Sequence, residues 1–325
     1  MKHLNIQIVE EVIKRMPGKK RPVTYLMKTL DLGKESAYRR IKNQIPFTFE
    51  EVIIIAKDLD LSIDQLLGQK TSNNITFSAD FNLEQEPADI YVNILTKDIA
   101  LIEKLITASD LKITAIINRI PLRFLPHKAL FKFEYCHYLY SSGYIPLMAQ
   151  FSDIIVPQQI SDLHEKSSNY FRGLKNVNCI LDSMVFPRLI KEIQYYHRMR
   201  FISDEDLHLL QTELFEMLEI YESLLRKGKN AAGSNYIFYY SLLNLDSNMV
   251  FIEFDNNFSL QLWIYPESSI IINNNPMIND IQKKLIDSKI RSSVMITKTN
   301  DTLQIEMLRD LYKQISDLTK STNTI

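Results

Sequence analysis

Glycine is scarce in this chain, with 7 among 325 residues, whereas globular proteins average about 7%. So few glycines disfavour an all-β architecture with many tight turns, and they disfavour glycine-rich phosphate loops. The two cysteines, Cys136 and Cys179, are too few for a disulfide framework or a cysteine-rich zinc site. We therefore expect a mainly helical protein in a reducing compartment, the cytoplasm.

Long apolar runs are missing as well. No stretch approaches the ~18 uninterrupted apolar residues that a membrane span requires. The first 16 residues carry Glu10, Glu11 and Lys14, where a secretory signal would have its apolar core. We expect neither a membrane segment nor secretion. Hydrophobic residues make up 46% of the chain, which is enough to build a packed core.

Charge of one sign is concentrated at one end of the chain. The formal net charge is −1, but residues 1–46 hold 11 Lys/Arg against 4 Asp/Glu, and residues 71–325 hold 25 against 30. A basic end on an acidic remainder favours a module that faces nucleic acid. Chance clustering of charge on a solvated surface is the alternative interpretation.

Composition predicts where the chain divides. The polar stretch 69–80 lacks helical periodicity and predicts a linker, and a glycine- and lysine-containing stretch at 227–234 ends a long helical region. We expect domains at 1–68, 81–228 and 229–325, of which the last two can form one unit. The predicted fold is mainly α, with a five-helix N-terminal domain, a central helical bundle and a small C-terminal α+β domain.

The helix signals are clearest in the first domain. Helices are expected over 6–16, 22–30, 34–42, 52–59 and 62–67. Thr48-Phe-Glu-Glu51 and Ser62-Ile-Asp-Gln65 are capping boxes ahead of the last two of these helices.

A helix with a heptad-like seam is expected in the central region. Ser203 is a good N-cap, because three acidic residues follow it in the first turn. The apolar residues behind it are spaced 3-4-3-4-3, which is typical of burial in a bundle or of a dimer seam. The predicted dimer seam consists of Leu207, Leu210, Leu214, Met217, Tyr221 and Leu224.

The last domain changes to an alternating pattern. Strands are expected over 236–245, 249–255, 260–265 and 269–272, and short turns between them predict an antiparallel meander. Helices are expected over 277–289 and 303–318, with one more strand over 293–297.

One segment resembles a known family. Residues 22–68 read PVTYLMKTLDLGKESAYRRIKNQIPFTFEEVIIIAKDLDLSIDQLLG. An apolar helix with Leu26, a tight turn and a second helix with Ala37 and Ile41 inward resemble the helix-turn-helix of lambda-repressor-like (Cro-type, XRE-type) regulators. The sequence departs from the family at the glutamines that often begin both helices. It also has Asp31 in place of the usual turn glycine, although Asp tolerates a left-handed turn.

The resemblance implies a set of DNA contacts. The second helix of such a motif lies in the major groove, with its N-terminal half toward the base edges. The implied base-contacting residues are Lys34, Glu35, Tyr38 and Arg39, of which Arg39 is best suited to a guanine edge. The implied phosphate-contacting residues are Lys19, Lys20, Arg21, Arg40 and Lys42.

Motifs for catalysis, metals and cofactors are missing from the sequence. His164-Glu165 lacks the second histidine of a zinc protease, and there is neither a Walker loop nor a dinucleotide fingerprint. Cys136 and His137 are neighbours in sequence, which does not make them a nucleophile and its base. We expect no catalytic residues, no metal and no cofactor.

The combined hypothesis is a cytoplasmic, sequence-specific DNA-binding transcription regulator. Its expected partners are double-stranded DNA, a second copy of the chain in a homodimer, and a small-molecule or peptide effector sensed by the C-terminal region. Three alternatives stay open: a peptide-sensing receptor, an interaction adaptor with a basic head, and an enzyme or effector fused to a DNA-binding head.

Overall fold

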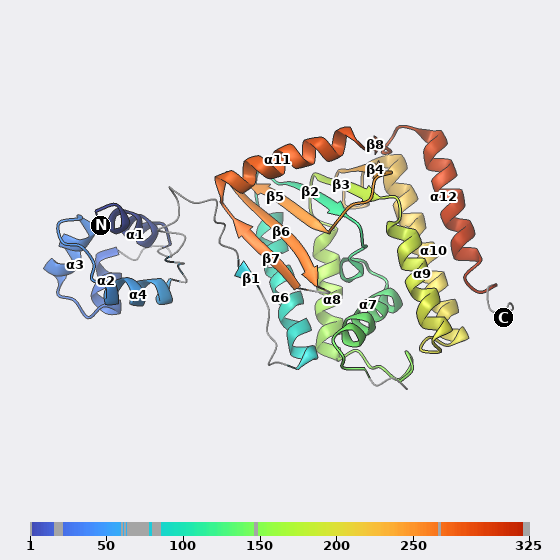
Figure 1. The fold of residues 1–325 in the computed structure, drawn as a ribbon, viewed down its shortest axis with the longest axis horizontal. Helices are drawn as coiled ribbons and strands as arrows, with labels where there is room; N and C mark the ends of the chain where they lie inside the picture. The colour runs from blue at the N-terminus through green and yellow to red at the C-terminus, as the bar shows by residue number, and fades with distance from the viewer. Residues whose placement is uncertain are drawn as a thin grey trace. The chain divides into compact units, whose positions relative to one another are not determined.

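The computed structural model describes residues 2–15, 22–59, 61, 63, 78–79, 86–145, 149–265 and 268–320. The chain divides into two compact units, Met1–Thr76 and Phe77–Ile325 (Figure 1). We call the first unit the head and the second the body. Each has an apolar core of its own.

The head is helical. Its helices are α1 (Lys2–Arg15), α2 (Pro22–Thr29), α3 (Lys34–Ile41) and α4 (Phe49–Asp58). These match four of the expected helices, and the fifth, over 62–67, lies outside the described residues apart from residue 63. The capping box at the start of α4 is present, because Thr48 Oγ1 accepts from the N–H of Glu51 while the Glu51 carboxylate accepts from the N–H of Thr48.

A tight turn joins α2 to α3. Asp31 adopts φ 50°, so it occupies the left-handed region that the sequence predicted it would tolerate. Leu26 of α2 and Ala37 of α3 are fully buried, and they pack the two helices together as expected. The remaining core of the head consists of Ile8, Val12, Val52 and Ile55.

The body combines a sheet with helices. Its helices are α6 (Pro87–Ile106), η1 (Leu122–Phe124), α7 (Lys128–Ser141), α8 (Gln158–Phe171), α9 (Val185–Arg198), α10 (Asp204–Lys227), α11 (Pro276–Arg291) and α12 (Asp301–Ser316). Its strands are β1 (Ser78–Ala79), β2 (Lys112–Ile117), β3 (Val177–Asp182), β4 (Tyr236–Ser241), β5 (Met249–Phe254), β6 (Asn257–Tyr265), β7 (Ser268–Asn273) and β8 (Val294–Met295).

These strands form one mixed sheet. Among the described residues it has eight strands in the order β1-β7-β6-β5-β2-β3-β4-β8. β2, β3 and β4 are parallel to one another, and the other pairs are antiparallel. The crossovers between the parallel strands contain α7 to α10, which is the arrangement that parallel pairing requires.

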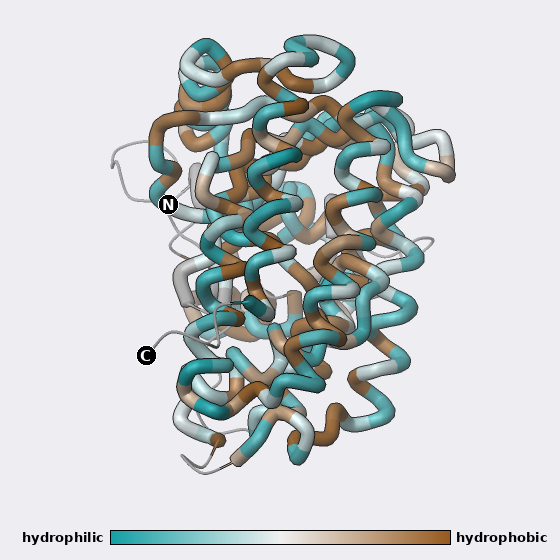
Figure 2. The backbone as a smooth tube through the Cα atoms, turned by 90° about the vertical axis from the view of Figure 1, so that its right-hand side faces the viewer, coloured by the Kyte–Doolittle hydropathy of each residue, from teal (hydrophilic) through white to brown (hydrophobic). Residues whose placement is uncertain are grey.

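The two faces of the sheet are covered unequally. Ile113 and Ala115 of β2 and Cys179 of β3 join the core that contains the α6, α7, α9, α10 and α12 side chains. Ile116 and Ile180, on the opposite face, pack with Ile290 of α11. Figure 2 shows teal and brown residues alternating along the helices, as expected for amphipathic helices that cover a core.

The predicted fold class is wrong. The body is an α/β unit with a mixed sheet rather than a helical bundle followed by a small α+β domain. The expected strands near β4 to β7 are present, but β4 pairs with β3 instead of joining the meander. The sequence analysis missed β2 and β3 because both are buried on two faces, so their sequences show an apolar run without alternation.

The predicted dimer seam is also wrong, because its side chains pack in the core of a single chain. Ser203 caps α10 as expected, and α10 packs against α7, α9 and α12. Five of the seam residues are buried in the core of the body and the sixth is partly buried against it: Leu207, Leu210, Leu214, Met217, Tyr221 and Leu224.

Two neighbouring leucines of α10 test this assignment. Leu210 is fully buried and Leu209 is 52% exposed. We expect Leu210→Ala to lower the free energy of unfolding of the body by about 2–5 kcal/mol, because it removes buried methyl groups and opens a cavity. Leu209→Ala is the control and should change it by less than about 0.5 kcal/mol. Urea unfolding followed by the fluorescence of Trp263, the only tryptophan, measures both, and equal effects would contradict the assignment.

Candidate nucleic-acid interface

Helix α3 presents a polar face to solvent. Ala37 is buried and Ile41 is partly buried toward the core of the head. The helical period places the side chains at 34, 35, 38, 39 and 42 away from that core. The four predicted base-contacting residues are all exposed, as is Lys42 just beyond the helix: Lys34, Glu35, Tyr38, Arg39 and Lys42.

The exposed face of α3 combines charge with one aromatic ring. Tyr38 is 47% exposed, and the ammonium group of Lys42 lies 5.8 Å from the centre of its ring. This distance is within the range of a cation–π contact. Lys34, Arg39 and Lys42 outnumber Glu35, so the face is basic and suited to a polyanion.

Arg40 does not belong to this face, which corrects its prediction as a phosphate contact. It is buried, and its guanidinium forms a two-point ion pair with Glu51 of α4. Nη2 lies 2.6 Å from Oε1 and Nε lies 2.9 Å from Oε2. The planar guanidinium matches the carboxylate in this geometry. Because Glu51 also caps α4, the pair fixes the end of α3 against the start of α4.

A second polar contact anchors α1 near the end of α3. The side-chain amide of Asn5 donates to Oδ1 of Asn43 at 2.6 Å and accepts from the N–H of Phe47 at 2.9 Å. Asn43 adopts φ 56°, which ends α3 in a left-handed turn. Hydrogen bonds from α1 and from α4 therefore hold the C-terminal end of α3 in place.

The remaining basic residues are divided between described and undescribed segments. The predicted phosphate contacts Lys19, Lys20 and Arg21 lie outside the described residues. The sequence analysis missed Lys28, which is exposed in the last turn of α2. Its place on α2 is the signal that could have suggested it as a candidate phosphate contact, because the first helix of such a motif crosses the phosphate backbone.

Cys136 and His137, the neighbouring thiol and imidazole of α7, are buried and partly buried, respectively. Burial raises the pKa of the Cys136 thiol to about 12 and lowers the pKa of His137 to about 4. His137 Nδ1 is hydrogen-bonded to the Tyr196 hydroxyl at 2.9 Å. Both residues therefore remain neutral at pH 7 and do not form a thiolate–imidazolium pair. Within the described ranges, no cluster of three potential metal ligands is present.

Comparison with known protein families finds a match in the N-terminal part of the chain, which does not confirm the lambda-repressor type. A family model described as the BetR domain matches residues 4–102, and this family is linked to regulators of the helix-turn-helix type. The match fits a DNA-binding N-terminal domain, and it extends beyond the head into α6. No curated protein and no solved structure matches the chain. Over the described part of the chain, no helix is both long enough and apolar enough to cross a bilayer.

Substituting the two adjacent arginines of α3 one at a time tests which of them stabilises the head. We expect Arg40→Ala to destabilise the head by about 1–3 kcal/mol, because the partly buried Glu51 carboxylate loses its two-point partner and keeps only the Thr48 N–H. Arg39→Ala, the control, should change the stability by less than about 0.5 kcal/mol. Hydrogen exchange of the α3 and α4 amides measures both effects. Similar protection in the two variants would contradict a structural role for Arg40.

Proposed function

We propose that this protein is a regulator of transcription whose head binds double-stranded DNA through α3. The observation that carries the proposal is the exposed basic face of α3 on a helix-turn-helix, within the segment that the BetR family model matches. In this proposal the chain is not an enzyme, and it acts in the cytoplasm.

Each exposed side chain has a role in this proposal. Arg39 bonds O6 and N7 of a guanine, and Lys34 contacts a second acceptor edge. Glu35 accepts from the amino group of a cytosine, and Tyr38 contacts a thymine methyl group or a sugar. The ammonium group of Lys42 neutralises a phosphate, as does that of Lys28 at the end of α2, and these contacts fix position rather than sequence.

The proposal includes a homodimer on DNA. One helix as short as α3 reads few bases, and two half-sites supply the additional contact energy that specific binding requires. The seam residues of α10 cannot supply this contact, because they are buried within the body. The proposal therefore places the contact between copies elsewhere than on that seam.

The fold of the body bears on the alternative functions. A peptide receptor built from stacked helical repeats requires each repeat to contact only its neighbours. The body instead pairs strands from distant parts of the chain in one sheet, which disfavours such a receptor. An adaptor with a basic head predicts an acidic protein partner and no DNA affinity, so a DNA-binding measurement distinguishes it from the proposed function.

The test is fluorescence polarisation of labelled genomic DNA fragments across a salt series. The full chain should bind tightly at low salt, and affinity should fall steeply as salt rises, because phosphate contacts release counterions. Lys42→Ala should weaken binding to all sequences and lower the salt slope by about 0.9. Absence of salt-sensitive binding would contradict the proposal and favour the adaptor.

Arg39→Ala tests whether the head reads sequence. Loss of a two-point guanine contact costs about 1–3 kcal/mol, which is roughly a 5- to 150-fold loss of affinity, confined to the selected DNA sites. Arg291→Ala is the matched control, since Arg291 is an exposed arginine at the end of α11 in the body. Uniform weakening on all DNA would make Arg39 a phosphate contact instead.

A further inference from the structure

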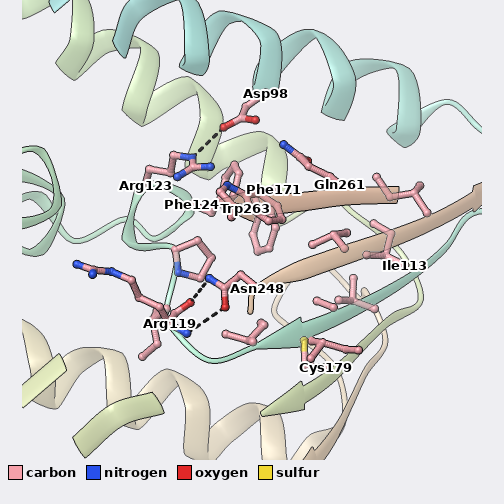
Figure 3. A pocket seen from close by; sticks show the side chains of 18 of the residues that line it. Asp98, Ile113, Arg119, Arg123, Phe124, Phe171, Cys179, Asn248, Gln261 and Trp263 are labelled. Carbon is pink, nitrogen blue, oxygen red and sulfur yellow. Dashed lines mark hydrogen bonds and ion pairs between the residues drawn. The ribbon is translucent and has the colours of Figure 1, made fainter. Parts of the chain in front are cut away.

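The body contains a cavity between α6 and the sheet. Its volume is about 390 Å³, which is within the range of small-molecule sites. Figure 3 shows that β2 runs along its floor, with Ile113 toward one end and Arg119 toward the other. Asn248 closes the second end, because its amide oxygen accepts from the N–H groups of Asn118 and Arg119 at 2.7 and 3.0 Å.

Most of the wall is hydrocarbon. Leu101 and Leu105 of α6 face Ala115 and Ile117 of β2 and Val250 of β5 across the cavity. Two aromatic rings add a flat side, since Phe124 and Phe171 stack with their centres 4.9 Å apart. Such a wall gains free energy by covering an apolar ligand and removing it from water.

One side of the cavity carries a buried charged triad. The guanidinium of Arg123 lies between two carboxylates, with Nε 2.9 Å from Asp98 Oδ2 and Nη1 3.3 Å from Glu134 Oε1. All three side chains are buried. These charged groups already bond one another, so an ionised ligand would lose its hydration in the cavity without gaining a free charge of opposite sign beside the triad.

The same guanidinium also disfavours a cationic ligand. Its central carbon lies 5.0 Å from the ring centre of Phe124 and 5.9 Å from that of Trp263. The aromatic faces that would attract a cation therefore already have one.

Two polar groups beside the triad suit a neutral ligand. Among the described residues, no protein group bonds the indole N–H of Trp263 or the side-chain carbonyl of Gln261, whose Nε2 donates to Ser269 at 3.0 Å. Both side chains line the cavity, and Figure 3 shows Gln261 pointing toward Asp98. Together they offer one donor and one acceptor.

We infer that this cavity binds an uncharged amphipathic small molecule, with an apolar body along β2 and an amide, amine or hydroxyl group at Trp263 and Gln261. The apolar body is covered by the aliphatic wall and by the stacked phenylalanines. The polar group accepts from the indole N–H and donates to the Gln261 carbonyl. The inference concerns the body and does not depend on DNA binding by the head.

A matched pair of fluorescent probes tests this inference on the full chain. N-phenyl-1-naphthylamine is uncharged and carries one N–H group, and 8-anilino-1-naphthalenesulfonate is the same scaffold with a negative charge. We expect the neutral probe to bind saturably, one per chain, and to quench Trp263 by energy transfer, since Trp263 lines the cavity. The sulfonated probe should bind at least roughly tenfold more weakly. Absence of saturable binding, binding without quenching, or equal affinity for both probes would overturn the inference.

Filling the cavity locates the bound probe. Val250→Phe should weaken binding of the neutral probe by roughly tenfold or more, because the added ring occupies the ligand volume. Ile117→Phe fills the same space from β2 and serves if the first variant fails to fold. Leu243→Phe is the control, because Leu243 is 62% exposed and does not line the cavity. Unchanged affinity in a folded filling variant would overturn the assignment.

Discussion

The body depends on one strand that hydrogen-bonds in two directions. β2 pairs in parallel with β3 and antiparallel with β5, so it joins the helical middle of the chain to the C-terminal meander. A buried backbone N–H or carbonyl must be paired, and loss of β2 would leave such groups on both neighbours. The same strand forms the floor of the cavity, which explains why the cavity lies where the two halves of the sheet meet.

In the head, two adjacent residues of one helix take different positions. Arg39 and Arg40 are adjacent, but successive residues of a helix point about 100° apart. One therefore faces solvent, and the other reaches Glu51 on α4. Because the Arg40–Glu51 pair and the Asn5–Asn43 contact hold the end of α3 in place, its exposed side chains are carried on an anchored helix. Rigid support of this kind is what recognition of base edges requires.

Much of the local structure could be predicted from the sequence. Capping residues such as Thr48 and Ser203 identified helix starts, and alternation identified the strands β5 to β7. The central strands β2 and β3 could not be predicted, since short apolar runs fit a buried helix as well as a buried strand. The cavity was equally beyond prediction, because its polar groups come from α6, η1, α7 and β6 and no sequence spacing relates them.

The sequence by itself determined the helix-turn-helix, its left-handed turn at Asp31 and the residues on the outer face of α3, because these follow from local backbone preference and from the period of one helix. Only the tertiary structure decided which apolar faces meet. In that structure the apolar side chains of α10 are buried inside the body, and Arg40 forms an ion pair with Glu51. Strands from the middle and from the C-terminal part of the chain join in one sheet. The physical reason is that burial and pairing depend on partners distant in the chain, and a local pattern records only that a face is apolar.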